Sequence, residues 1–549
     1  MQEELRRSTA DYEAWGKKRE TAVLTHGVES KQADVAIIAE DIALQEMRNA
    51  KVKEGQLATA LAIAKANEHN KAIADVGNSL REHAATIGMD ADQESEERND
   101  LSIEYARIIT QQLPTMINLL KKITEPRQMK KIKHGMVTLM VYGIFCFVLQ
   151  ISSRREANNT LTWPQFEANL FALFPDLKTM PHADTLFRLL RDMGDNVQQI
   201  EQALIALVGK LIRRKKFRRF LINNCYPIAI DGSRKTTFNC LWSEALLQQR
   251  IAGSVEKSDA QYQYYIYVLE ASICLHNGMV IPLMSEFLDF RQGDGDRNKQ
   301  DCETLAFHRM ASRLKKAFPR LPILLLLDGL YAQGPVIECC ENYNWQYMIV
   351  LKDGSLSTVW DEYHGLLPLQ PKNEYHHTWG GRKQCFRWVN NIRYEYGQNN
   401  SKHLTLNVVV CHEQWPDIDE NKQKVILESK HVWLSSNPLR RENLHERCNL
   451  GARYRWGIEA NFLVEKHQGY QYEHSFANDW NAMRGYHYLM RIGHLLNTLA
   501  RFSSTLSKKF REMGVRGFID FIRMSLSGPW FDLKTIQSRI RLPFELCLI

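Results

Sequence analysis

The spacing of apolar residues changes several times along the chain. Residues 101–220 have apolar positions at helical spacing, as in "TWPQFEANLFALF", which predicts a series of helices. Near Asn223 short apolar runs begin to alternate with helical segments, and this continues to about residue 365. Residues 366–436 have the alternation of strands, and helical spacing returns from 437. The pattern predicts an α/β protein with helices before it and a block of strands within it.

Two fully apolar runs in the central part end on an aspartate that is followed by glycine. These are "PIAIDG", which ends at Asp231, and "LLLLDG", which ends at Asp328. Two further strands are predicted from "YQYYIYVLEASICLHNG" and "MVIPLMSEFLDF", joined by a turn at Asn277-Gly278. Strands followed by an alternation of helix and strand predict a mixed sheet with helices on its faces.

These changes divide the chain into six segments. They are 1–100, an acidic helical or partly disordered appendage; 101–220, a helical region; 221–365, the first part of an α/β core; 366–436, a β-strand insertion; 437–505, the last helices of the core; and 506–549, a C-terminal helical tail.

Charge is distributed unevenly along the 549 residues. The net charge is +8, but residues 1–100 carry more acidic than basic residues, so the remainder is distinctly basic. A basic excess suits a polyanionic partner such as DNA. It is densest in "KLIRRKKFRRF", which contains Lys210, Arg213, Arg214, Lys215, Lys216, Arg218 and Arg219. This run is either a contact surface for phosphates or a solvated face.

A second candidate DNA contact lies in the helical region. Two short helices joined near Pro181 are compatible with a helix-turn-helix, in which Arg188 and Arg191 of the second helix would meet DNA. A plain helical bundle fits the same pattern. We therefore expect residues 101–220 to bind DNA ends, with the helix-turn-helix as one of two interpretations.

Other features narrow the class of protein. The apolar segment 135–151 is at the lower limit of a membrane span and contains polar residues, so we predict a buried core helix and no membrane association. The first residues are charged and there is no C-x-x-C pair among eleven cysteines, which favours a cytoplasmic protein with reduced thiols. The pair His376-His377 has no Cys or His partner at zinc-binding spacing along the chain, so we do not predict a zinc site there.

Three carboxylates are candidates for a metal site. Asp231 and Asp328 are expected at the carboxyl ends of core strands, where open α/β sheets bind ligands, and Glu459 lies on a later helix. Such hard oxygen ligands suit Mg²⁺, and two ions about 4 Å apart can activate a nucleophile and stabilise a leaving oxygen. Alternatively, each aspartate merely caps a turn.

The helix that carries Glu459 also carries two cations in register. Arg455, Glu459 and Lys466 are four and seven residues apart, which predicts one shared face, while Trp456 and Phe462 should pack on the domain. Arg455 and Lys466 would then contact substrate phosphates on either side of the carboxylate. The competing interpretation is an ordinary Arg455–Glu459 salt bridge.

These residues resemble the DDE transposases of bacterial insertion sequences. The resemblance spans roughly residues 130–505 and rests on "AIDGS" with Asp231, "KQDCE" at 299–303, "LLLLDGLY" with Asp328 and "RYRWGIEANFLVEK" with Glu459. The order Asp, Asp, β-strand insertion, Glu is similar to the subgroup with a Y-x2-R-x3-E-x6-K signature. Arg455, Glu459 and Lys466 match that signature, but Ala452 stands at the tyrosine position.

The resemblance implies a fold and an activity. The fold would be a ribonuclease-H-like domain interrupted by a β insertion, with Asp231, Asp328 and Glu459 as catalytic, metal-binding residues for two Mg²⁺ ions, which Mn²⁺ can replace. The activity would be cleavage of double-stranded DNA at the element's ends and transfer of the 3′-OH to target DNA by a homodimer. The protein would be bacterial, cytoplasmic and associated with the nucleoid.

The resemblance also bears on the β insertion. Relatives with such an insertion release their element through a DNA hairpin, and an aromatic residue can hold the flipped base. Candidates for that role are Trp379, Trp388 and Trp433, which can equally be packed inside the insertion. Two other functions remain as alternatives: a ribonuclease-H-like nuclease without strand transfer, and a non-catalytic DNA-binding protein descended from a transposase.

Overall fold

The protein is described here from a computed structural model, which places residues 91–174, 177, 179–251, 262–293, 300–418, 424–528, 538–542 and 545–548. Most of the predicted appendage, residues 1–90, lies outside the described residues. Arg98–Ile549 forms one compact unit, and its start is close to the boundary predicted at residue 100.

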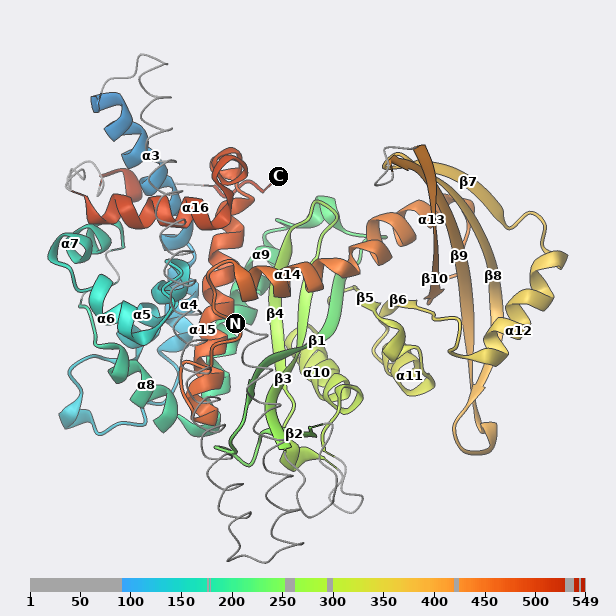
Figure 1. Ribbon diagram of the computed structural model, residues 1–549, viewed down its shortest axis with the longest axis horizontal. Coiled ribbons are helices and arrows are strands. Elements are labelled where there is room, and N and C mark those ends of the chain that lie inside the picture. Colours follow the sequence, from blue (N-terminus) through green and yellow to red (C-terminus); the bar gives the residue numbers. More distant parts are fainter. Residues whose placement is uncertain are drawn as a thin grey trace, which may run out of the picture. The chain divides into compact units, whose positions relative to one another are not determined.

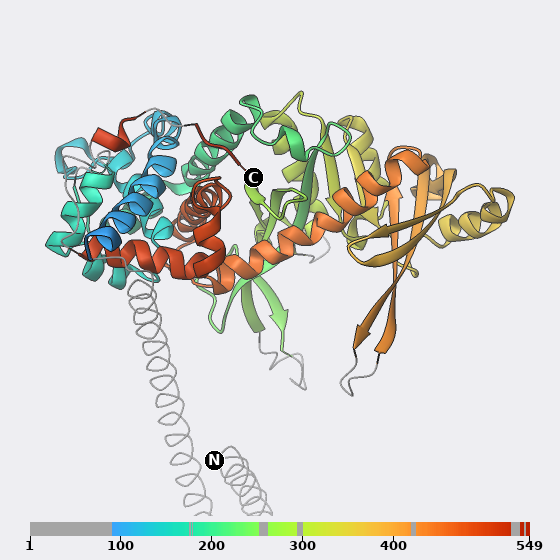
Figure 2. The same cartoon turned by 90° about the horizontal axis from the view of Figure 1, so that it is seen from above.

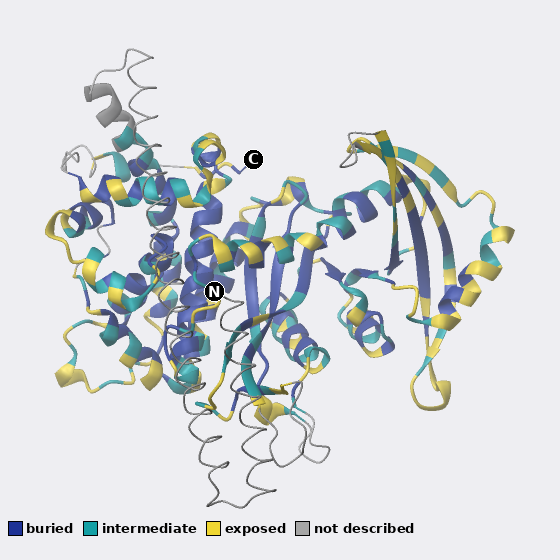
Figure 3. Cartoon of the chain, viewed as in Figure 1, coloured by how far each residue is buried: buried dark blue, intermediate teal, exposed yellow. Residues whose placement is uncertain are grey.

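Helices from both ends of the chain gather around one central helix, α15 (Figure 1). The helix α15 is apolar or buried on nearly every side and packs on α5, α8 and α9 (Figure 3). The helices of this part are α3 (Ala91–Thr110), α4 (Leu113–Leu120), α5 (Met136–Val148), α6 (Arg154–Thr160), α7 (Pro164–Leu173), α8 (Ala183–Asp192), α9 (Gln199–Arg213), α15 (Trp480–Arg501) and α16 (Ser507–Ser527). The predicted helical character of residues 101–220 is confirmed.

The apolar segment 135–151 forms the buried helix α5, as predicted. Close approach of α5 to α15 depends on two glycines: a Cβ added at Gly493 would lie 2.7 Å from Phe147, and one at Gly143 would lie 2.7 Å from Leu489. Within the described part of the chain, no helix combines the length and the apolar composition that a membrane span needs.

The two helices of the possible helix-turn-helix do not form that motif. They are α7 and α8, and nine residues separate them (174–182) where a helix-turn-helix has about 3–4. The helix α7 packs on α16, and α8 packs on α5, α6 and α15. The apolar faces of α7 and α8 therefore serve the bundle, which is the alternative that the sequence left open.

One ten-stranded mixed sheet runs through the rest of the unit. Its order is β2-β3-β1-β5-β6-β10-β9-β8-β7, with β4 also paired to β3. Pairing is parallel between β1, β5 and β6 and antiparallel elsewhere. The strands are β1 (Tyr226–Phe238), β2 (Leu247–Arg250), β3 (Tyr262–Cys274), β4 (Val280–Phe287), β5 (Ile323–Leu327), β6 (Gln346–Val350), β7 (Glu374–Trp379), β8 (Arg382–Tyr396), β9 (Lys402–Ile418) and β10 (Lys424–Ser435).

The first predicted strand is longer than the sequence indicates. We expected it to end at Asp231, but β1 continues to Phe238 because β3 pairs with it along that whole length. The parallel pairing with β5 runs only from Tyr226 to Ala229. Asp231 is therefore at the end of the parallel part of the sheet and inside a longer antiparallel ribbon.

The strand block predicted at 366–436 is present as β7 to β10, but it is continuous with the central sheet. The end of β10 pairs with β6, with Trp433 opposite Val350 and Ser435 opposite Met348. These strands extend well beyond β6 and curve away from it (Figure 2).

Helices cover both faces of the central strands. The helix α10 (Glu303–Ala317) packs on β3 and β4, and α11 (Gly334–Asn342) packs on β6. On the other face α14 (Trp456–His467) crosses β1, β3 and β4 (Figure 1). The helix α12 (Ser357–Leu366) packs on β8, and the short α13 (Arg441–Leu444) leads into a π-helical turn before α14.

A buried ionic cluster fixes α14 between the sheet and α15. Arg491 of α15 forms an ion pair with Glu270 of β3, and its Nη1 also lies 3.1 Å from Glu465 Oε1 of α14. His494 Nδ1 lies 2.6 Å from the same Glu465 oxygen. Burial raises the pKa of Glu270, whereas Arg491 and His494 outweigh the burial of Glu465 and lower its pKa.

We expect Arg491→Leu to lower the free energy of unfolding by about 3–5 kcal/mol, because it removes the buried cation that Glu270 and Glu465 share. Urea denaturation followed by circular dichroism measures this loss. The control is Arg511→Leu, an arginine exposed on α16. Equal stability of the two variants would contradict a structural role for the cluster.

Candidate carboxylate site

The sheet register places two of the predicted carboxylates side by side. Tyr226 pairs with Ile323 and Ala229 with Leu326 in the parallel strands β1 and β5. Continued by two residues, the same register sets Asp231 opposite Asp328. Neighbouring strands are about 4.8 Å apart, so both residues emerge at one edge of the parallel strands.

Glu459 reaches this edge from α14, through Arg455. Arg455 Nη1 lies 2.9 Å from Glu459 Oε1 and 3.5 Å from Asp231 Oδ2. The arginine side chain is buried, and its Nε and Nη1 atoms have no hydrogen bond of good geometry. The predicted Arg455–Glu459 pairing is present, but the guanidinium stands between two acids and does not face solvent.

Asp328 has a local role as well as its place at the sheet edge. Its Oδ1 accepts a hydrogen bond of 2.7 Å from the Leu330 amide and so caps the turn that follows β5. Lys352 Nζ, from the segment after β6, lies 3.7 Å from Asp328 Oδ2. The turn-capping alternative is thus correct for Asp328, whose second carboxylate oxygen faces Lys352.

The negative charge of the three carboxylates is not fully balanced by the neighbouring cations. Burial raises the pKa of Asp231 to about 6, and the charges of Glu459 and Asp328 add to the rise against the opposing effect of Arg455. Carboxylate oxygens are the ligands that Mg²⁺ prefers, so the residues present fit that ion. The ligand atoms of these three acids are not gathered within 4.8 Å of one another, and cations hold them in this arrangement.

The turn before α14 is held on both sides by charge. Arg453 forms an ion pair with Glu413 of β9, two residues before Arg455 pairs with Asp231. Hydrogen bonds from Gln384 and Arg453 outweigh burial and lower the pKa of Glu413 to about 2. The position of Glu459 therefore depends on β9 as well as on β1.

Lys466, the second predicted phosphate contact, lies away from the acids. It is about 10 Å from Glu459 along α14, and its Nζ is 3.3 Å from Glu473. At the tyrosine position of the signature, Ala452 is buried, and Tyr454 packs edge-on against His276.

One prediction about α14 is wrong. Trp456 is 63% exposed and does not pack on the domain, whereas Phe462 is buried as expected. The helix begins only at Trp456, which puts this side chain on the solvent side, with the Arg455 guanidinium 5.0 Å from its ring. Trp456 is thus an exposed aromatic beside Arg455 that the sequence analysis assigned to the core.

Two of the three candidate base-stacking tryptophans are buried. Trp388 and Trp433 pack inside the curved sheet, where Trp433 stacks on His431 with ring centroids 5.6 Å apart. Trp379, at the end of β7, is half-buried and faces His445 and Arg453. Of the three, Trp379 alone has an accessible part of its ring.

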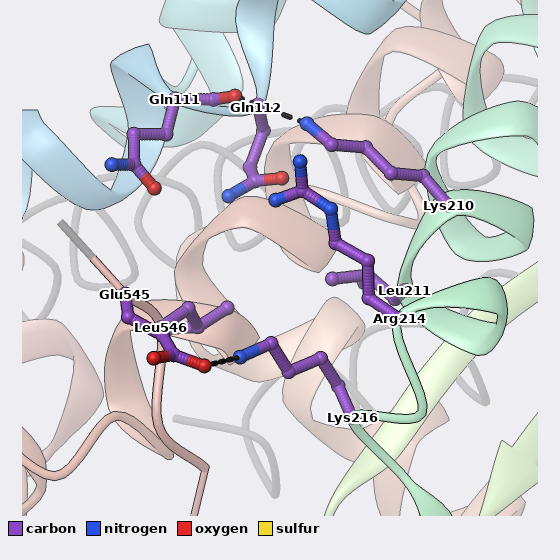
Figure 4. A pocket seen from close by; sticks show the side chains of 8 residues that line it. All are labelled: Gln111, Gln112, Lys210, Leu211, Arg214, Lys216, Glu545 and Leu546. Carbon is purple, nitrogen blue, oxygen red and sulfur yellow. Dashed lines mark hydrogen bonds and ion pairs between the residues drawn. The ribbon is translucent and has the colours of Figure 1, made fainter. Parts of the chain in front are cut away.

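The basic run forms a separate surface around two neighbouring pockets. In the first, of about 310 Å³, Lys210 of α9 and Arg214, which follows that helix, extend toward Gln111 and Gln112 (Figure 4). Lys216 is paired to Glu545 at 3.1 Å across its rim. The second, of about 640 Å³, is lined by the cations Arg214, Lys215, Lys216, Arg218 and Arg219 with the C-terminal residues 545–548.

This surface and the acids are formed by different parts of the chain. The basic run precedes the start of β1 at Tyr226, and Asp231 lies about 17 Å further along the strand. Arg188 and Arg191 are exposed on α8, where Arg191 pairs with Asp192. The structure brings Asp231, Asp328, Glu459 and Arg455 together, and it leaves the other predicted cations outside that group.

A further acid near the site faces the opposite side of the sheet. Glu303 of α10 is hydrogen-bonded to the hydroxyls of Tyr267 and Tyr331, the second at 3.2 Å. A Cβ at Gly232 would lie 2.8 Å from Glu303 Oε1, and residues adjacent in a strand point to opposite faces. Glu303 therefore supports the sheet behind Asp231.

Comparison with known proteins leaves the family open: no family model and no curated protein matches this chain.

We expect Asp231→Asn to raise the free energy of unfolding by about 1–2 kcal/mol at pH 7.5 without divalent ions. The pKa of Asp231 in the folded protein, about 6, is above the value of 3.8 for an aspartate in an unfolded chain, so the native state binds this proton more tightly. In the wild type, the ionised Asp231 carboxylate lowers the free energy of unfolding above about pH 6. The extra stability of Asp231→Asn should therefore disappear below about pH 4, where the carboxyl is protonated in both states. Urea titrations at several pH values measure it.

The matched control is Asp361→Asn, an exposed carboxylate on α12. A loss of stability in Asp231→Asn at pH 7.5 would instead show that the Asp231–Arg455 ion pair stabilises the fold.

Proposed function

We propose that this protein is a DDE-type DNA transposase with a ribonuclease-H-like core. The observation that carries the proposal is the register that sets Asp231 opposite Asp328, with Glu459 linked to Asp231 through Arg455. The antiparallel strands β1, β3 and β4 beside the parallel β5 and β6, with helices on both faces, support such a core. The strands β7 to β10, between α12 and α13, would be the β insertion.

The chemistry requires two reactions at phosphorus. In the first, water attacks the phosphodiester at the element boundary and the bond to the 3′ oxygen breaks, which leaves a 3′-OH. In the second, that 3′-OH attacks a target phosphodiester and forms the new strand junction. Two Mg²⁺ or Mn²⁺ ions, when bound to the three carboxylates, would activate the attacking oxygen and stabilise the leaving one.

The chain's own residues would prepare this site. Arg455 would link Asp231 to Glu459, and Lys352 would hold Asp328, before any ion is bound. The exposed ring of Trp456 offers a surface against which a base or sugar of the DNA end can stack. Within the insertion, Trp379 would be the residue that stacks on a flipped base.

The basic surface around Lys215, Lys216, Arg218 and Arg219 would hold DNA outside the cleavage site. Phosphate contacts position DNA without reading its sequence, so this surface would fix the duplex while the carboxylates act on the cleaved bond. Two such complexes would have to meet to join both ends to one target, which is the reason to expect a homodimer on DNA.

Cleavage should be abolished in Asp231→Ala, Asp328→Ala and Glu459→Ala, at least 1,000-fold by order of magnitude, while binding to end DNA persists. The measurement uses labelled DNA that carries an element end, with Mg²⁺ or Mn²⁺, and a denaturing gel. The control is Glu473→Ala, an exposed acid that pairs with Lys466 outside the carboxylate group.

Three outcomes separate the candidate functions. Cleavage followed by joined products supports a transposase, and a hairpin product would add the route of excision. Cleavage without joining would favour a nuclease of the same fold. Binding with no cleavage in either ion would favour a non-catalytic DNA-binding protein.

Replacing Lys215, Lys216, Arg218 and Arg219 by Ala should weaken binding to all DNA sequences and reduce the slope of log K against log salt by about 3–4. Fluorescence anisotropy at several salt concentrations measures the slope. The control removes the same charge from a different surface, through Lys121, Lys122, Lys130 and Lys131, all exposed. If both sets of replacements change the slope equally, the basic run contributes only through the net charge of the protein and is not a specific DNA contact.

A further inference from the structure

The hairpin β7–β8 has a well-defined register. Its turn consists of Gly380 and Gly381, both with positive φ (58° and 76°), as two-residue hairpin turns require. The register sets Trp379 opposite Arg382, and so His376 opposite Cys385. On the next strand, His412 of β9 is opposite Cys385.

These cross-strand partners share the outer face of the sheet. Residues directly opposite in antiparallel strands point to the same side, about 5 Å apart. His376 and His412 are exposed and Cys385 is partly exposed, whereas the alternating neighbours Gln384, Phe386 and Cys411 are buried. The row His376–Cys385–His412 is therefore accessible from solvent.

Glu374 adds a carboxylate to this row. The ligand atoms of Glu374, His376 and Cys385 all lie within 4.8 Å of one another, with His376 Nε2 2.9 Å from Glu374 Oε1. Among the described residues this is the one group of three or more His, Cys, Asp or Glu side chains gathered so closely.

A cation already stands at this cluster. Arg387 Nε lies 2.8 Å from Glu374 Oε2, and the arginine also interacts with the Cys385 thiol. Its side chain is 48% exposed, so it can turn into solvent without a rearrangement of the strands. The cluster thus attracts positive charge, and the group that now supplies it is replaceable.

We propose that Glu374, His376 and Cys385, with His412 as the fourth ligand, bind a zinc ion on the outer face of β7, β8 and β9. Imidazole, thiolate and carboxylate are the ligand types that zinc uses, and four of them complete a tetrahedral site. The spacing along the chain does not reveal such a site, because its ligands come from three strands. The proposal is independent of the DNA chemistry at Asp231.

Metal binding would replace two existing interactions. The Cys385 thiol would lose its proton to solvent, and Arg387 would release Glu374. Because zinc binds the thiolate and releases the thiol proton, affinity should increase with pH over the neutral range. The bound ion would connect the edge strand β7 to β8 and β9 and stabilise that end of the sheet.

The experiment is a titration of the reduced full-length protein with Co²⁺, followed by competition with Zn²⁺. A thiolate-to-cobalt charge-transfer absorption should appear at one equivalent and disappear when zinc displaces cobalt. Cys385→Ser should abolish it, and His376→Ala or Glu374→Gln should weaken zinc affinity more than about 10-fold. The matched control is Cys240→Ser, which removes an exposed cysteine elsewhere.

Two more variants test the details of the site. Arg387→Ala removes the competing cation and should strengthen zinc binding. If the cluster is only an ion-pair network held by Arg387, this variant should not bind zinc more tightly. His412→Ala should weaken binding, and His403→Ala, an exposed histidine on the same strand, should not.

The proposal is wrong if the charge-transfer absorption is absent from the wild type, or if it persists in Cys385→Ser and is lost in Cys240→Ser. An unchanged affinity in His412→Ala would overturn the assignment of the fourth ligand. Far-ultraviolet circular dichroism of each variant checks that its overall secondary structure matches the wild type, which separates a loss of binding from a loss of fold.

Discussion

The arrangement of the carboxylates depends on Arg491, a fully buried cation that pairs with Glu270 of the sheet and Glu465 of α14. A buried arginine with two carboxylates is costly to desolvate, and apolar residues would hold α14 in place at least as well. What the ion pairs add is a defined position, because α14 can satisfy Glu465 in one place only. Glu459 is less than two helical turns from Glu465, so its reach toward Asp231 follows from that position.

The same principle continues toward the amino end of α14. Arg453 is bound by Glu413 of β9, and Arg455 by Asp231 and Glu459. The turn between the curved strands and α14 is thus connected to both parts of the sheet by alternate arginines. The strands β7 to β10 therefore influence the position of Glu459, because a shift of β9 would move Arg453 and with it the start of α14.

Much of this could be predicted from the sequence, where local pattern decides the outcome. The apolar runs before Asp231 and Asp328 identify two core strands. The polar residues within segment 135–151 favour a buried helix over a membrane span, and α5 is that helix. Local pattern does not predict which strands pair with each other or which charged residues meet. The extension of β1 to Phe238 depends on β3, and the exposure of Trp456 depends on where α14 begins. The burial of Arg455 depends on which acids it meets. Lys466 lies on the face of α14 that carries Glu459, but its partner Glu473 comes from the segment after the helix, and local pattern does not predict that pairing.

Two carboxylate-containing clusters in this protein differ in a way that decides which ion each can take. The cluster at Asp231 contains only oxygen ligands, its acids are spread apart, and buried Arg455 already compensates part of their charge. A hydrated, hard cation suits such a site because water can fill the remaining positions. The cluster at Cys385 is compact, contains nitrogen and sulfur, and has the exposed Arg387 as its compensating cation. A softer ion that binds directly to protein ligands suits it better, so the two sites need not compete for the same metal.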